Sequence, residues 1–91
     1  MISKQLVIKG RVQGVSYRAW FAELAKNLNL SGWVRNRLDG TVEALVHGTP
    51  ADIEAIIRAA HSGPTLAKVE EIIESDAPSH QEAGFIIKPT A

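Results

Sequence analysis

The spacing of apolar residues changes along the chain, and each change predicts a new strand or helix. A short apolar run at residues 6–8 stops at Gly10, which is typical of a central strand. Beyond it, apolar residues recur every three or four positions and predict one buried helix face that fades near Asn29. They are Tyr17, Trp20, Phe21, Leu24, Ala25 and Leu28.

The middle of the chain predicts a hairpin followed by a second helix. Strand-like runs at residues 33–37 and 41–47 are joined through Asp39 and Gly40, a strong hairpin signal. Val42, Ala44 and Val46 should share one face of the second run. The helix begins at residues 49–52 with a capping hydroxyl, a proline and an acidic residue, and Gly63-Pro64 ends it. Its buried stripe is Ile53, Ile56, Ile57 and Ala60.

Two further strands complete the predicted order. Residues 67–75 and 85–87 read as strands, and the polar stretch 76–83 reads as a loop between them. The resulting order predicts an α+β fold: a ferredoxin-like two-layer sandwich, βαββαβ with an extra C-terminal strand, with two helices on one face of a mainly antiparallel sheet. Periodicity alone leaves another two-layer α/β arrangement open, and it does not place the terminal strand in the sheet.

Composition narrows the classes of function. The 91 residues and 45% apolar content suit one domain over residues 1–91 with one modest core. Ten basic and ten acidic side chains give zero net charge, so no overall field favours nucleic acid or an anionic membrane. No cysteine is present, which excludes disulfides and thiolate chemistry. No leader or membrane-spanning segment is apparent, and we expect a cytoplasmic protein.

The stretch from Gly10 to Arg18 is the best candidate for a binding site. It runs from the first strand into the first helix, and glycines at positions 10 and 14 let the backbone bend so that successive amide N–H groups face one concavity. The helix start adds its positive end, and a guanidinium can grip phosphate through two parallel hydrogen bonds. A plain turn between a strand and a helix is the simpler interpretation of the same residues.

A resemblance to a known family makes this site specific. Residues 8–18 resemble the first signature of the acylphosphatase family, and residues 32–42 resemble its second. Gly48 falls where the second signature closes, and a weaker likeness continues through Gly63, Pro64, Ala67 and Val69. Tyr17 stands where the family most often has Phe, and Ser16 where it often has a larger residue or Cys. Neither change removes a backbone N–H or the arginine.

The resemblance implies the same ferredoxin-like fold and a cofactor-independent hydrolase. Such an enzyme splits acyl phosphates into carboxylate and inorganic phosphate, with a small-molecule substrate and neither metal nor organic cofactor. By resemblance, Arg18 and Asn36 are the catalytic residues. The backbone amides of Gln13, Gly14, Val15, Ser16, Tyr17 and Arg18 form the phosphate-binding loop.

Strand alternation gives Asn36 a second interpretation. It places Val34, Asn36 and Leu38 on one face of the strand, and Trp33, Arg35 and Arg37 on the other. A buried amide that satisfies nearby backbone is the structural explanation of the asparagine. The resemblance implies instead that Asn36 holds the attacking water.

The required chemistry fits what the chain contains. A carboxylate leaving group needs no strong general acid, so a site that neutralises the phosphoryl oxygens and positions one water meets most of the demand. The phosphate of the substrate is the expected proton acceptor, because asparagine cannot take up a proton. Arg11, Arg35 and Arg37 are expected either to raise the local potential or to be solvated charges. His47, His61 and His80 lack ligand-like spacing, so no metal site is expected.

Three other functions remain open from the sequence. An RNA-binding module of this fold normally stacks bases on strand aromatics, which residues 41–47 lack. An anion sensor would use the same donors without turnover, and an accessory role within a larger assembly is the third. We expect a monomer that acts on a small molecule, with no nucleic-acid or membrane partner.

Overall fold

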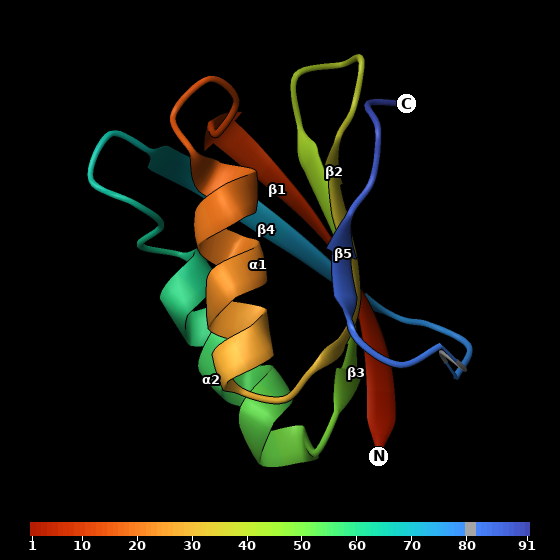
Figure 1. Cartoon of the computed structure of the whole chain (residues 1–91). Coiled ribbons are helices and arrows are strands. Elements are labelled where there is room, and N and C mark those ends of the chain that lie inside the picture. The colour runs from red at the N-terminus through yellow and green to blue at the C-terminus, as the bar shows by residue number, and fades with distance from the viewer. Residues whose placement is uncertain (80–81) are drawn as a thin grey trace.

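The computed structural model describes residues 1–79 and 82–91, which form one mixed sheet covered on one face by two helices (Figure 1). The elements follow in the order β1 (Ile2–Arg11), α1 (Tyr17–Asn27), β2 (Ser31–Asn36), β3 (Val42–Gly48), α2 (Pro50–Ala60), β4 (Lys68–Asp76) and β5 (Phe85–Ile87). The predicted ferredoxin-like order βαββαβ with an additional strand is therefore confirmed.

The sheet has the strand order β4-β1-β3-β2-β5. β3 pairs antiparallel with both β1 and β2, so β1 and β2 run parallel with β3 between them. The terminal strand, which periodicity could not place, pairs parallel with the outer edge of β2. The chain beyond β5 continues along that edge, because the amide of Ala91 donates to the carbonyl of Asn36 at 3.1 Å.

The core lies between the sheet and the helices and follows the predicted periodicities. The alternate residues Val42, Ala44 and Val46 of β3 are fully buried, as are Phe21 and Ala25 of α1. Trp20 packs against this core while remaining partly exposed. Trp33 lies on the uncovered face, with the guanidinium carbon of Arg35 4.8 Å and the Lys88 ammonium 4.5 Å from the centre of its ring.

Local signals set the ends of the second helix and the hairpin. The hydroxyl of Thr49 accepts a hydrogen bond from the amide of Asp52 at 3.2 Å and caps α2. In the hairpin, Gly40 has φ of 92° and its amide donates to the carbonyl of Arg37 at 3.1 Å. Leu38 lies beyond the end of β2 and is exposed, so the predicted alternation stops at Asn36.

Candidate functional site

The loop between β1 and α1 has the backbone geometry of an anion cradle. Gly14 has φ of 73° and Ser16 has φ of 67°, both in the left-handed region. Left-handed residues at every second position let successive N–H groups point into one concavity. A side chain at position 14 would meet nothing within 4 Å, so the positive φ, rather than a lack of space, favours glycine there.

The amide N–H groups of this loop lack protein partners. Within residues 1–79 and 82–91, no backbone amide of residues 13–18 donates a hydrogen bond to a backbone or side-chain acceptor. The two helix starts differ in the same way: Thr49 caps α2 and Asp52 lies in its first turn, whereas Ser16 makes no side-chain cap to α1 and no acidic residue follows it. The start of α1 is therefore open to an external anion.

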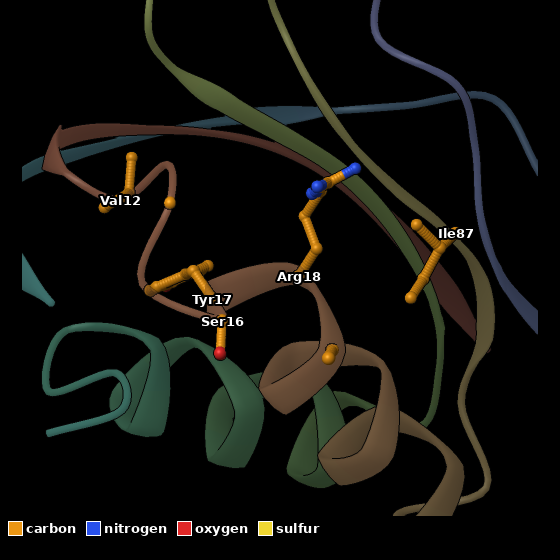
Figure 2. A pocket seen from close by; sticks show the side chains of 7 residues that line it. Val12, Ser16, Tyr17, Arg18 and Ile87 are labelled. Carbon is orange, nitrogen blue, oxygen red and sulfur yellow. The ribbon is translucent and has the colours of Figure 1, made fainter. Parts of the chain in front are cut away.

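Arg18 lies in the first turn of α1 and lines a pocket of about 400 Å³ (Figure 2). The other lining residues are Val12, Gly14, Ser16, Tyr17, Ala19 and Ile87. In the described part of the chain, Arg18 forms no ion pair, so its guanidinium is available to a ligand. Figure 2 shows the Ser16 hydroxyl pointing away from the guanidinium, a poor arrangement for a nucleophile acting on a group that Arg18 holds.

Asn36 ends β2, where it lies opposite Val42 of β3. Its Oδ1 atom is buried and has no hydrogen-bond partner among the residues that the structure describes. The interpretation of Asn36 as an amide that satisfies nearby backbone therefore fails for this oxygen. Because an unpaired buried acceptor costs about 1–3 kcal/mol, the retained carboxamide is a candidate to hold a ligand or a water.

The side chain of Gln13 ties the loop to the end of β2. Its Nε2 atom donates to the carbonyl oxygens of Arg37 at 2.8 Å and Thr41 at 2.9 Å. Asn36, which directly precedes Arg37, is not among the residues that line the Arg18 pocket. The start of α1 and the end of β2 lie at the same end of the sheet (Figure 1), and the side chain of Gln13 links the loop before α1 to the residues that follow Asn36.

Sequence reasoning missed two features of this region. Sequence reasoning assigned Gln13 a role only through its backbone N–H, because the carbonyls that its side chain binds are 24 and 28 residues away along the chain. It assigned no role to Ile87, which lines the pocket from β5 and is 48% exposed. The exposed apolar side chain becomes a signal only once β5 is placed beside β2.

Arg35 and Arg37 lie on the uncovered face of the sheet and both pair with Glu43. The distances to Oε1 of Glu43 are 2.8 Å from Nε of Arg35 and 3.1 Å from Nη1 of Arg37. Burial by itself raises the pKa of Glu43, but the hydrogen bonds and charges of the two arginines outweigh burial and hold that pKa below its usual range. Both arginines are thus paired on the face opposite the helices, away from the pocket.

The histidines do not gather around the candidate site. Nδ1 of His47 lies 2.6 Å from the hydroxyl of Ser3, His61 follows the end of α2, and His80 lies outside the described residues. Among the residues that are described, no three His, Asp or Glu side chains are close enough to hold a metal ion together. The same residues contain no helix long and apolar enough to cross a membrane.

Comparisons with known proteins agree on one family. The acylphosphatase family model matches residues 4–87. The acylphosphatase of Acidiphilium cryptum is 49% identical over 90 residues, covering 99% of both chains, and that of Azoarcus sp. is 51% identical over 90 residues, covering 99% of this chain and 92% of the relative. The crystal structure of acylphosphatase from Bacillus subtilis superposes with a TM-score of 0.92 at 32% identity, covering 97% of this chain and 99% of that one.

Proposed function

The chain belongs to the acylphosphatase family, and on that premise we propose how its residues hydrolyse the carboxyl–phosphate bond of acyl phosphates. The backbone amides of residues 13–18 and the guanidinium of Arg18 hold the phosphoryl group, and the carboxamide of Asn36 positions the attacking water. The observation that carries this proposal is a set of backbone amides, beside the guanidinium of Arg18, that have no partners in the part of the chain that the structure describes.

The reaction asks little of a general acid. The water oxygen bonds to phosphorus as the bond to the bridging oxygen breaks, and that oxygen leaves with the acyl group as a carboxylate. Because the leaving group is already a stable anion, the main barrier is the approach of water to a negatively charged phosphoryl group. Donors that are fixed before the substrate arrives lower that barrier without reorganising.

Asn36 supplies the second requirement. Its Oδ1 atom accepts a hydrogen bond from the water, and its side-chain amide donates one. The unpaired state of Oδ1 supports this role, because no donor among the described residues competes with the water. The water proton passes to an oxygen of the phosphoryl group, since an asparagine side chain does not act as a base. The scheme requires neither a metal nor an organic cofactor, and no second subunit.

Release of inorganic phosphate from benzoyl phosphate in the presence of EDTA tests the proposal. We expect turnover well above spontaneous hydrolysis. Loss of one preorganised donor lowers rates by about 10²–10³, so Arg18→Ala and Asn36→Ala should each lose at least that much. Arg18→Ala should also weaken inhibition by inorganic phosphate, whereas Asn36→Ala should keep that inhibition.

Matched controls separate these effects from general damage. Arg58→Ala removes an exposed arginine paired with Glu54 on α2, and Asn27→Ala removes an exposed asparagine at the end of α1. Both variants should retain the full rate. A wild-type chain that binds phosphate but releases none from benzoyl phosphate would favour the anion sensor. A normal rate in Asn36→Ala would refute the water-positioning role.

Ser16→Ala tests the alternative in which the Ser16 hydroxyl, rather than water, attacks the phosphoryl group. The hydroxyl of Ser16 points away from Arg18 (Figure 2), so its removal should change the rate less than about threefold. Complete loss of phosphate release in this variant would make Ser16 the nucleophile and replace the water-attack scheme.

A further inference from the structure

We propose that Ile87 forms a subsite for apolar acyl groups, so that the chain prefers acyl phosphates with an aromatic or branched aliphatic acyl group over small polar ones. This inference rests on the proposed function, and it names the substrate class of the same site. The sequence identified a place for the phosphoryl group but none for the acyl group.

The pocket is built from two parts of the fold. The loop and the start of α1 supply its donors, through residues 12–19, and Ile87 of β5 is the one lining residue that comes from elsewhere in the described chain (Figure 2). A phosphoryl group held by the amides and Arg18 therefore leaves its acyl substituent to face the remaining walls. The apolar walls are supplied by Val12, Ala19 and Ile87.

The exposure of Ile87 is unusual for its place in the sheet. Alternation along β5 puts Ile87 on the same face of the sheet as Phe85, which is 5% exposed in the core. The register partner of Ile87 on β2 is Val34, which is fully buried. Ile87 is nevertheless 48% exposed. This exposed side chain is the part of β5 that lines the pocket.

The size and charge of the pocket fit an apolar substituent. Its volume of about 400 Å³ lies within the range of roughly 300–1,000 Å³ typical of small-molecule sites, so it has room for more than a phosphoryl group. In the described part of the chain, Arg18 is the one charged residue that lines it. A carboxylate or ammonium on the acyl group would have no partner of opposite charge once Arg18 holds the phosphoryl group.

The kinetic test compares benzoyl phosphate with acetyl phosphate. We expect wild type to have the higher kcat/KM for benzoyl phosphate, and Ile87→Ala to lower that value by about tenfold while changing the acetyl phosphate value less than about twofold. The neighbouring Ile86→Ala is the matched control, because Ile86 is 52% exposed on the opposite face and should leave both values unchanged. Ile87→Thr, which retains the branched shape, should lower the benzoyl preference in the same direction.

Binding of non-hydrolysable acylphosphonates separates this proposal from the hydrolytic one. Benzoylphosphonate should bind wild type more tightly than acetylphosphonate, and Ile87→Ala should remove most of that difference, whether or not the chain turns over acyl phosphates. Inhibition by inorganic phosphate should stay unchanged in the variant. Equal affinity for the two phosphonates in wild type, or an equal fall for both in Ile87→Ala, would overturn the acyl subsite.

Discussion

Tyr17→Phe isolates one buried hydrogen bond that fixes the start of the helix carrying Arg18. Tyr17 begins α1 and is 1% exposed, and its hydroxyl donates to the carbonyl of Ala60, the last residue of α2, at 2.7 Å. Phenylalanine keeps the ring contacts with Trp20 and Phe21 and removes only the hydroxyl. The change therefore measures the link between the two helices with little loss of packing.

The expected magnitude follows from that geometry. The lost hydrogen bond leaves a buried carbonyl unpaired, which should lower the free energy of unfolding at pH 7 by about 1–2 kcal/mol. For a domain of this size, such a loss lowers the melting temperature by about 5–15 °C. Thr49→Ala, which removes the cap of α2, is a useful comparison and should lose about 1 kcal/mol.

The pH dependence gives the prediction a second, independent readout. Burial raises the pKa of the Tyr17 phenol far above its usual range. Below the unfolded-state pKa of about 10, the phenol keeps its proton in both the folded and the unfolded state, so its contribution to the free energy of unfolding does not vary with pH. Above it, the unfolded chain releases the proton and the folded chain does not, so wild type loses about 1.4 kcal/mol per pH unit. Tyr17→Phe lacks this loss, and its deficit of about 1–2 kcal/mol should close between about pH 10.5 and 11.5.

Urea denaturation from pH 7 to 12, with phenolate absorbance as the proton readout, checks both parts. Tyr17 is the single tyrosine of the chain, so the absorbance change reports one group. Thr49→Ala should still lose stability at alkaline pH as wild type does, because it retains the Tyr17 phenol. A folded phenol that titrates near pH 10, or a Tyr17→Phe variant as stable as wild type at pH 7, would refute the buried hydrogen bond.

Three further changes test the tether, the sheet and the uncovered face. Gln13→Leu removes the two hydrogen bonds by which the side chain ties the loop to the end of β2. The free energy of unfolding in urea should fall by about 1–2 kcal/mol, and kcat should fall more than the affinity for inorganic phosphate. An unchanged kcat would contradict this role of the side chain. Gly10→Ala places a Cβ 2.2 Å from the carbonyl oxygen of Lys68, at a residue with φ of 124°. This should lower the free energy of unfolding by about 2 kcal/mol or more. A melting temperature within about 5 °C of wild type would contradict that close approach. Glu43 is 4% exposed and has a lowered pKa, so its stabilising contribution is present above the unfolded pKa of about 4.3 and is lost as pH falls through the folded value. Glu43→Gln should therefore be less stable than wild type at pH 7, and acid denaturation should show the difference in stability narrowing below about pH 4. A difference that stays constant with pH would contradict the pairing of Glu43 with the arginines.

Local signals in the sequence determined most of the elements. The spacing of Tyr17, Phe21 and Ala25 selects one helix face, and the alternation of β3 selects one strand face, because each depends only on the period of its own backbone. The hairpin turn and the cap of α2 were likewise predictable, since their hydrogen bonds join residues two to four positions apart. The cradle loop belongs to the same class, because its shape is set by left-handed residues within the loop.

The tertiary structure decided which of these local features meet. Alternation put Trp33 opposite Val34, but only the packing of both helices on one face left Trp33 on the uncovered side. The register of β2 against β3 placed Arg35 beside Glu43, and Oδ1 of Asn36 has no partner among the described residues.

The sequence by itself determined which residues carry the family signatures and the order of the helices and strands, whereas β1 and β2 begin earlier than the apolar runs indicated, at Ile2 and Ser31. The tether from Gln13 and the exposure of Ile87 came only from the folded sheet. The physical reason is range: backbone period and turn chemistry act within a few residues. The contacts of Gln13 join residues 24 and 28 positions apart, and the place of Ile87 depends on the pairing of β5 with β2, whose residues are farther apart still along the chain.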